Sequence, residues 1–317
     1  MSQSQQEKRS SYEMINYKIR PAKSIERKML CESFGRLNYF APINEYRYIG
    51  FGSPFFADFT LFHKQLGIQK MISIEKDEEN ESRFLFNKPY KCIEMRFGDS
   101  NEQLPEIEWE TNKNIVWLDY DGHLEKKIFE DIHTVLFNAT SGSVVIISVN
   151  VHLRKGQEVA LLNKLLQDKM PEGLTNSDLE YWKAAEVCKN IIDNNIIEVL
   201  EDRNKTESNK FKFQQLYYLG YADGAKMLTF GGIIYQESDT QVLELCKFTD
   251  DMPYINKSNH INIIDVPSLT FKEVRHIDSQ LPHELLSEVS SPGVQEGDIN
   301  RYAQIYKYFP AFSETEI

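Results

Sequence analysis

The sequence predicts an α/β fold in which helices cover both faces of a doubly wound, mostly parallel sheet. Short apolar strand segments alternate with helical segments over residues 46–150, an order that requires crossover connections and parallel strands. Two of these strand segments, "NIVWL" and "SVVIISV", are apolar at every position, which indicates burial on both faces. Two later strand-like segments have a connection short enough for an antiparallel hairpin.

Composition limits the classes of partner. A chain of 317 residues, 41% of them hydrophobic, can bury a large core. Its formal charge of -12 repels a phosphate backbone, which argues against a nucleic-acid partner. The four cysteines lack the spacing of a zinc site and are expected to be reduced. Because there is neither a signal peptide nor an apolar run near the ~20 residues of a membrane helix, we expect a cytoplasmic protein without a membrane partner.

The first part of the chain divides into an N-terminal helical segment, 1–45, and an α/β core, 46–151. The first helix is predicted to begin at Pro21, because proline suits a first helical turn, and its apolar stripe reaches Leu37. Apolar runs bounded by turn residues predict core strands over residues 46–50, 70–75, 92–97, 114–119 and 143–149. Core helices are predicted around residues 55–66, 78–86 and 124–138, with a loop over residues 98–105.

The rest of the chain divides into three further segments. Residues 152–210 form a helical insertion, residues 211–250 complete the core with a late hairpin, and residues 251–317 form a C-terminal helical segment. For the hairpin we predict that "AKMLTFGGIIYQ" pairs with "QVLELCKF" through the short connection "ESDTQ". This pair would add an antiparallel edge to the parallel sheet.

The loop after the first predicted strand, "GFGSPFFADF", indicates a nucleotide-cofactor site. Ligands of open parallel sheets bind outside the carboxyl ends of the strands. Gly50 and Gly52 let the backbone turn and approach a ligand, whereas Ser53 replaces a third glycine and can cap the next helix. Glu75 ends the second strand, where an acid accepts hydrogen bonds from ribose hydroxyls.

A third acid follows the third strand. Asp99, with Ser100 beside it, can accept a hydrogen bond from an adenine amino group. Each of these signals is weak alone, but three at successive strand ends predict one pocket. The alternative interpretation is that the glycines make a tight turn and the acids are solvated.

The fourth strand ends in "WLDYDG", which brings candidate catalytic groups to the same edge of the sheet. Asp119 and Asp121 can accept a proton from an acceptor or position it, and Tyr120 can stack on it. Two acids separated by one residue can also hold magnesium, although we assign no metal. Alternatively, Asp119 caps the following helix and Asp121 makes a turn with Gly122.

Basic residues gather on the first predicted helix. Arg20, Lys23 and Arg27 recur at spacings of three and four, which puts them on one side of the helix. If this helix covers the mouth of the pocket, these residues favour an anionic ligand or a phosphate. The alternative is an ordinary solvated helix face.

The motifs "YIGFGS", "SIEKDE", "FGDS" and "WLDYDG" resemble those of class I S-adenosylmethionine-dependent methyltransferases. More narrowly, "RPAKSIERKM", "YIGFGSPFFADF" and "FNKPY" resemble a microbial family described as O-methyltransferases. The resemblance implies a Rossmann-like, seven-stranded sheet with an antiparallel last strand. It also implies S-adenosylmethionine as the cofactor, bound by Gly50, Phe51, Gly52, Ser53, Glu75, Lys76, Asp99 and Ser100. The superfamily often has an acid where this chain has Tyr48.

The function that this resemblance implies is O-methyl transfer to an unidentified acceptor. The segment "LDYDG" is not the Asn/Asp-Pro-Pro-aromatic signature of enzymes that methylate amino groups on bases. Two alternatives stay open on the sequence. One is a catalytically inactive methyltransferase fold that serves as a binding or sensor protein. The other is a nicotinamide-dependent oxidoreductase, since a glycine turn followed by an acid is common to both groups.

Overall fold

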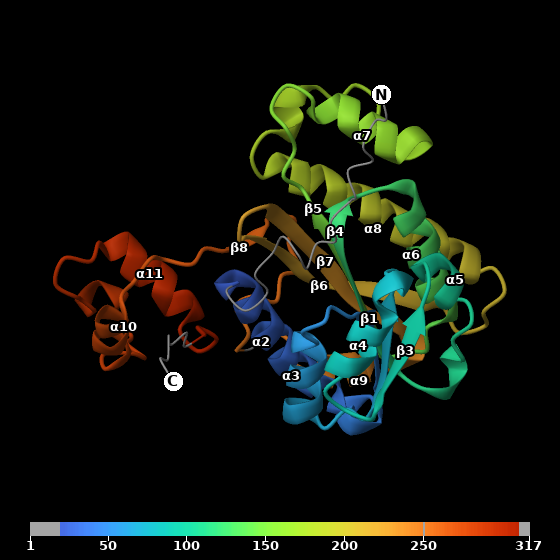
Figure 1. The fold of residues 1–317 in the computed structure, drawn as a ribbon, viewed down its shortest axis with the longest axis horizontal. Coiled ribbons are helices and arrows are strands. Elements are labelled where there is room, and N and C mark those ends of the chain that lie inside the picture. The colour runs from blue at the N-terminus through green and yellow to red at the C-terminus, as the bar shows by residue number, and fades with distance from the viewer. Residues whose placement is uncertain (1–19, 250, 311–317) are drawn as a thin grey trace.

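The computed structural model describes residues 20–249 and 251–310, which form one eight-stranded sheet in the order β3-β2-β1-β4-β5-β7-β6-β8 (Figure 1). The strands are β1 Arg47–Phe51, β2 Lys70–Glu75, β3 Ile93–Phe97, β4 Asn114–His123, β5 Ser143–Asn150, β6 Phe211–Ala222, β7 Lys226–Gln236 and β8 Asn262–Ile264. Strands β1 to β5 are parallel, whereas β7 runs antiparallel between β5 and β6. The α/β prediction is therefore confirmed, with one strand more than expected.

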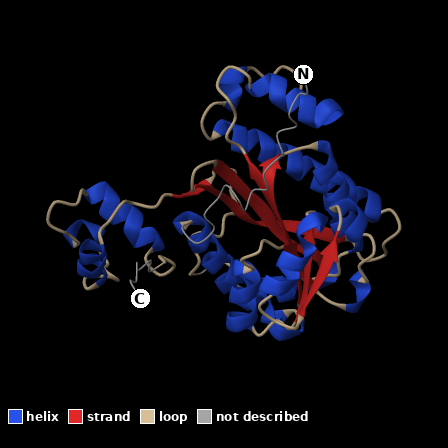
Figure 2. Ribbon diagram, viewed as in Figure 1, coloured by secondary structure: helices blue, strands red, loops and turns tan. Residues whose placement is uncertain are grey.

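Helices cover both faces of the sheet (Figure 2). They are α2 Pro21–Gly35, α3 Ala57–Leu66, α4 Glu81–Asn87, α5 Ser100–Gln103, α6 Lys126–Asn138, α7 Glu158–Leu166, α8 Lys183–Arg203, α9 Thr240–Leu245, α10 Phe271–Asp278 and α11 Glu296–Ile305. Buried residues of α2, α3 and α9 pack on one face and those of α6, α7 and α8 on the other. Successive residues of β5, such as Val144 and Val145, alternate between the two faces. This arrangement explains why that strand is apolar at every position.

The structure corrects the predicted hairpin. β7 pairs with β6, which precedes it, and the turn between them contains Asp223. The segment expected to be its partner forms helix α9 instead. Its buried residues Leu243 and Cys246 are three positions apart, a helical spacing rather than the alternation of a strand. The predicted loop over 98–105 likewise contains the short helix α5.

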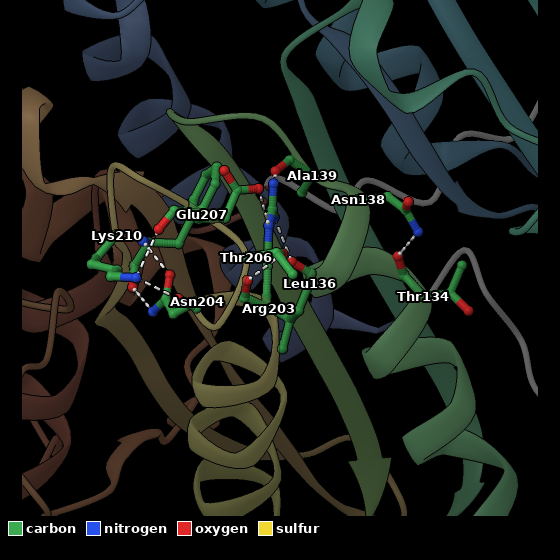
Figure 3. Close-up of polar contacts among 10 residues, drawn as sticks. Thr134, Leu136, Asn138, Ala139, Arg203, Asn204, Thr206, Glu207 and Lys210 are labelled. Carbon is green, nitrogen blue, oxygen red and sulfur yellow. Dashed lines mark hydrogen bonds and ion pairs between the residues drawn. The ribbon is translucent and has the colours of Figure 1, made fainter.

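The long helix α8 is fixed to its neighbour α6. Figure 3 shows the Arg203 guanidinium pointing at the end of α6, where it donates to the carbonyl oxygens of Leu136 and Ala139 at 2.7 and 2.8 Å. The same side chain lies over the Phe211 ring, 3.5 Å from its centroid. These bonds satisfy carbonyls that a helix end leaves without partners. The buried apolar residues of α8 also belong to the same hydrophobic cluster as those of α6, on one face of the sheet.

The C-terminal helices lie to one side of the sheet. Figure 1 shows α10 and α11 beyond β8, away from the other helices. They enclose a small cluster of their own, which includes Ile277, Val289 and Tyr302. Among the described residues, no helix has both the length and the apolar composition that crossing a bilayer requires.

Candidate active site

A cavity of about 370 Å³ opens at the carboxyl ends of β1, β2, β3 and β4. These four strands are parallel neighbours, so the residues at their ends meet at one edge of the sheet. The predicted site residues that line the cavity are Phe51, Gly52, Ser53, Glu75, Lys76, Asp99, Ser100, Asp119, Tyr120, Asp121 and Arg27. Gly50, Arg20 and Lys23 are not among the lining residues.

The glycine loop meets the cavity through Gly52 rather than Gly50. A side chain at Gly52 would overlap the Ser73 hydroxyl, so glycine lets the backbone form this part of the wall. Gly50 lies within β1, where a side chain would overlap the Tyr48 phenol. The structure therefore replaces the expected cofactor contact of Gly50 with a packing requirement.

Ser53 lines the cavity but does not cap α3 as the sequence suggested. The helix is preceded by Phe56, whose φ of 44° places it in the left-handed region, and its first turn has no side-chain cap. The Ser53 hydroxyl instead accepts a hydrogen bond from the Phe55 amide at 3.3 Å. The hydroxyl therefore belongs to the turn at the cavity wall.

Asp58 is a cavity residue that the sequence analysis missed. It lies in the first turn of α3 and accepts a hydrogen bond from the Tyr48 phenol. Burial raises the pKa of Asp58, although the charge of Arg27 opposes the shift. An acid immediately after the glycine loop was the signal available in the sequence. Tyr48 has no carboxylate of its own, but its hydrogen-bond partner Asp58 places one near the end of the first strand.

Glu75 ends β2 with a half-buried carboxylate at the cavity. One of its oxygens accepts a hydrogen bond from the Asp77 amide at 3.2 Å. Burial raises the pKa of Glu75 to about 7. Burial thus makes ionisation of this carboxyl group unfavourable at neutral pH. Because pKa values shifted in this way cluster at functional sites, Glu75 marks a candidate ligand site.

Asp99 follows β3 and pairs with two lysines. Its carboxylate lies 2.6 Å from the Lys76 ammonium and 3.6 Å from that of Lys127. The hydrogen bond from Lys76 lowers the pKa of Asp99. Lys76 therefore links the ends of β2 and β3, and Asp99 is ionised at neutral pH.

Ser100 and Tyr120 share one acceptor, Asp131 of α6, which the sequence analysis also missed. Both hydroxyls donate to the same carboxylate oxygen. The Tyr120 ring also packs edge to face against Phe51, with 4.9 Å between centroids. These contacts hold the Tyr120 ring in one orientation at the cavity.

Asp119 is held by Lys23. The Lys23 ammonium lies 2.8 Å from Asp119 and 2.8 Å from Glu26, and it sits 4.2 Å from the centre of the Trp117 ring. The side chains of Lys23 and Glu26 are both 0% exposed. Burial alone would raise the pKa of Asp119, but Lys23, with Arg27 nearby, lowers it. The structure thus corrects the expectation that Lys23 faces an acceptor, because its charge is used inside the protein.

Helix α2 covers one side of the cavity. Asp223, in the β6–β7 turn, accepts hydrogen bonds from the amides of Ala22 and Lys23 at 3.1 and 2.8 Å. These bonds satisfy amides that the first helical turn leaves without partners and fix the helix to the sheet. Arg27, one turn further on, therefore reaches the cavity, whereas Arg20 is buried outside the lining.

The end of β4 is extended rather than turned. The strand continues to His123, with a register shift against β5 between Asp119 and His123, and no side chain caps α6. The alternative interpretation of Asp119 as a helix cap and Asp121 as a turn residue is therefore wrong. Within the described part of the chain, no group of three or more His, Cys, Asp or Glu side chains is arranged to hold a metal ion.

Comparison with protein families decides the class of this site. A family model described as "Putative O-methyltransferase" matches residues 15–317. The chain belongs to this family. The description agrees with the motifs, which had implied a methyltransferase with S-adenosylmethionine as its cofactor. Comparison with curated proteins found no match.

Solved structures similar to the methyltransferase share little of its sequence. Trm1 from Pyrococcus horikoshii with S-adenosyl-L-methionine is 11% identical, with 71% of this chain and 58% of that one covered at a TM-score of 0.46. Cofactor-bound Rv0187 from MTB is 11% identical, with 67% and 88% covered at 0.36. Spermidine synthase from Thermotoga maritima is 11% identical, with 72% and 67% covered at 0.37. The chain thus spans little more than half the length of the first of these.

The charge of the methyltransferase cavity suits a sulfonium cofactor. Eight acids line it, namely Asp58, Glu75, Asp77, Asp99, Asp119, Asp121, Glu125 and Asp131. Only three of the residues that line this cavity are lysine or arginine, namely Arg27, Lys76 and Lys127. A surplus of carboxylates attracts a positively charged sulfur and repels a pyrophosphate. The residues present therefore fit S-adenosylmethionine and disfavour a nicotinamide dinucleotide.

Proposed function

We propose that this methyltransferase transfers its methyl group to an oxygen, with Asp119 as the group that orients the acceptor hydroxyl. The observation that carries the proposal is the ion pair between Asp119 and buried Lys23 at the cavity wall. Because Lys23 keeps Asp119 ionised, its carboxylate can accept a hydrogen bond from a hydroxyl. The same carboxylate would hold an amine acceptor in its ammonium form, which has no lone pair for attack.

The cofactor residues act as a series along the sheet edge. When bound, S-adenosylmethionine supplies a methyl group on a positively charged sulfur. In our proposal Glu75 accepts hydrogen bonds from the ribose, with Lys76 beside it. Asp99 and Ser100 border the adenine, and the backbone from Phe51 to Ser53 lies against the methionine part. The walls that they form are apolar at Ile74 and Ile128, which suits a base and a ribose face.

Arg27 is better suited to the cofactor than to the acceptor. It is the single arginine among the described residues that line this cavity, and its Nε is buried without a hydrogen-bond partner among them. Asp58 lies near it, because the charge of Arg27 opposes the rise that burial causes in the pKa of Asp58. We assign Arg27 to the methionine carboxylate and Asp58 to the methionine ammonium, since each then gains an opposite charge.

Asp121 and Tyr120 complete the acceptor side of the cavity. Asp121 is exposed at the end of β4, so a proton received there reaches solvent directly. The Tyr120 ring, held by Asp131 and Phe51, forms a fixed wall against which an acceptor can pack. In the proposed reaction the acceptor oxygen would form a bond to the methyl carbon as the bond from that carbon to sulfur breaks, S-adenosylhomocysteine would leave as a neutral thioether, and the acceptor proton would pass to Asp119 or Asp121.

Labelled methyl transfer to a panel of alcohols, phenols and carboxylic acids, with the matched amines, tests the proposal. We expect oxygen acceptors to be methylated and their amine counterparts not. Asp119→Asn should lower turnover by at least about 100-fold while S-adenosylhomocysteine binds within about threefold of the unchanged protein. Asp121→Asn should cost less, because Asp121 is exposed.

Two results would overturn this assignment. Preferential methylation of the amines would show that nitrogen is the acceptor atom. Loss of S-adenosylhomocysteine binding in Asp119→Asn would show that Asp119 belongs to the cofactor half of the site. A protein that binds the cofactor and methylates nothing in the panel, with Asp119 and Asp121 both dispensable for a physiological role, would favour the inactive binding protein.

A further inference from the structure

A second hollow, of about 210 Å³, lies at the carboxyl end of β5. Its walls come from three separate segments of the chain. Val151 and His152 follow β5, Tyr181 precedes α8, and Lys226 begins β7. Glu158, the first residue of α7, lines it as well. None of the motifs that predicted the cofactor site includes these residues.

This hollow adjoins the cofactor cavity along the sheet edge. β4 and β5 are parallel neighbours, and His123 pairs with Asn150 where both strands end. The His123 Nδ1 and the Asn150 carbonyl oxygen are 2.8 Å apart. Tyr120 and Asp121 line the cofactor cavity on one side of this contact, and the residues after Asn150 line the second hollow on the other.

Glu158 is a buried acid with an unused oxygen. It is 4% exposed, and its Oε2 accepts no hydrogen bond from any described residue. Burying a carboxylate oxygen without a hydrogen-bond donor costs more free energy than burying an unpaired neutral polar group. Glu26, the other deeply buried glutamate near the sheet edge, also has an oxygen that accepts no hydrogen bond from a described residue, but its carboxylate forms an ion pair with Lys23, whereas Glu158 forms none with a described residue. The unpaired oxygen of Glu158 therefore points to a ligand that brings a donor.

Two lysines, a second acid, Glu180, and the ring of Tyr181 also line the hollow. Lys155 and Lys226 both line it, and the Lys226 ammonium lies 5.2 Å from the centre of the Tyr181 ring and 5.9 Å from that of Trp182. These ring contacts hold the Lys226 charge in place. Two lysines repel a ligand that is only cationic, and the unpaired Glu158 repels one that is only anionic.

Tyr181 adds an independent observation. Its φ of 57° lies in the left-handed region, although its side chain is 77% exposed and contributes little to the core. A non-glycine residue in this conformation is strained, and such strain concentrates at ligand sites. This backbone conformation places the Tyr181 ring beside Lys226 at the hollow.

We propose that this hollow binds the head group of the methyl acceptor, and that the head group is zwitterionic, with an ammonium next to a carboxylate as in an α-amino acid. Glu158 receives the ammonium, and Lys226 with Lys155 receives the carboxylate. The inference rests on the proposed function, because it assigns the ligand to the methyl acceptor. An acceptor held here extends along the end of β4 toward Tyr120 and Asp121.

Ligand binding to the protein saturated with S-adenosylhomocysteine tests the proposal. Saturation-transfer NMR would compare L-serine with ethanolamine, which lacks the carboxylate, and 3-hydroxypropanoate, which lacks the amine. A thermal-shift series over the common α-amino acids would then find side chains that bind more tightly. We expect zwitterions to bind, and both singly charged analogues to bind at least about tenfold more weakly.

Variants separate this site from the cofactor site. Glu158→Gln and Lys226→Met should each weaken zwitterion binding at least about tenfold while leaving S-adenosylhomocysteine affinity within about twofold. Glu201→Gln, an exposed position on α8, serves as the matched control and should change neither. Melting temperatures report folding, and Glu158→Gln should melt no lower than the unchanged protein because an unpaired carboxylate is removed.

Three results would overturn the proposal. They are absence of binding by every amino acid in a protein that still binds S-adenosylhomocysteine, equal binding by ethanolamine or 3-hydroxypropanoate, and unchanged zwitterion binding in Glu158→Gln. Failure of S-adenosylhomocysteine itself to bind would instead count against the proposed function. The two failures are therefore distinguishable in one experiment.

Discussion

The two hollows at the sheet edge differ in how their polar groups are satisfied. Around the cofactor cavity two carboxylates are paired with lysines, Asp99 with Lys76 and Asp119 with Lys23, although Arg27 Nε has no hydrogen-bond partner among the described residues. In the second hollow the buried Oε2 of Glu158 accepts no hydrogen bond from a described residue, and Glu158 forms no ion pair with one. On the cofactor side these two carboxylates therefore have their cations before a ligand arrives, whereas on the proposed acceptor side Glu158 is left for a ligand to satisfy.

The two hollows also differ in how the chain builds them. Each wall of the cofactor cavity comes from the loop that follows a parallel strand, so its residues occur in the order of the strands. The second hollow joins residues 151–158, 179–181 and 226, which converge only because β7 returns antiparallel beside β5. A short motif can therefore describe the first hollow but not the second.

The largest expected effect concerns the pairing on the cofactor side. Lys23→Met should lower the free energy of unfolding by about 3 to 5 kcal/mol, because it leaves Glu26 buried without its cation. Denaturant unfolding measures the loss. The control is Lys126→Met, which breaks an exposed pair with Asp168 and should lower the free energy of unfolding far less, because solvent screens the pair. If both substitutions lowered the free energy of unfolding equally, the buried ion pair of Lys23 would contribute no more to stability than an exposed one.

The next effect separates the ligands of the two hollows. Glu75→Gln should weaken S-adenosylhomocysteine binding about 100-fold, since hydrogen bonds to a charged group contribute about 1.5 to 3 kcal/mol each. Glu158→Gln should leave that affinity unchanged. Isothermal titration calorimetry measures both. A similar loss in both variants would mean that the two hollows form one cofactor site.

Substitutions at two glycines compare what an added side chain would meet in the first loop and in β7. Gly52→Ala should destabilise the protein by about 1 to 3 kcal/mol, because the added methyl meets the Ser73 hydroxyl, and Ser73→Ala should restore most of the loss. Gly231→Ala on β7 meets the Val145 carbonyl oxygen, so a second side-chain change should not rescue it. Thermal unfolding of the single and double variants measures this difference. If Ser73→Ala did not restore the stability of the Gly52→Ala protein, the expected overlap between the two side chains would be wrong.

A smaller effect follows from the pKa of Glu75, which burial raises to about 7. Its ionised form accepts two ribose hydroxyls, so S-adenosylhomocysteine affinity should fall up to about tenfold as the pH is lowered from 8 to 6. The raised pKa means that Glu75 lowers folding stability by its full amount above pH 7, and that this cost shrinks as the pH falls from 7 toward the unfolded pKa of about 4.3. Glu75→Gln should therefore melt higher than the unchanged protein at pH 8 and lose the pH dependence of binding.

The smallest effect concerns the strain on the acceptor side. Tyr181→Gly should raise the free energy of unfolding by up to about 1 kcal/mol, because glycine adopts a positive φ without strain and the exposed ring contributes little packing. The zwitterion affinity of the second hollow should fall at the same time. Denaturant unfolding and ligand titration measure the two changes. A loss of stability would show that the ring supports the fold rather than the site.

Much of the cofactor side was predictable from local pattern. Gly52, Glu75, Asp99 and Asp119 each occur at the end of an apolar run, and the carboxyl ends of parallel strands share one edge. Asp58 and Asp131 were missed because they lie in helices, where an acid usually faces solvent. The misplaced hairpin has a similar cause, since the six residues of α9 are too few to show a clear helical period.

The sequence by itself determined the fold class, the family and the loops that line the first cavity, because hydrophobic period and motif order are local properties of the chain. Only the tertiary structure decided that Lys23 neutralises Asp119 from inside the protein and that Gly50 is a packing residue. It also decided that Glu158, whose Oε2 accepts no hydrogen bond from a described residue, shares a hollow with Lys155 of its own segment and Lys226 of a distant one. These facts depend on which side chains meet after burial, and no spacing along a chain specifies the partners of a buried charge.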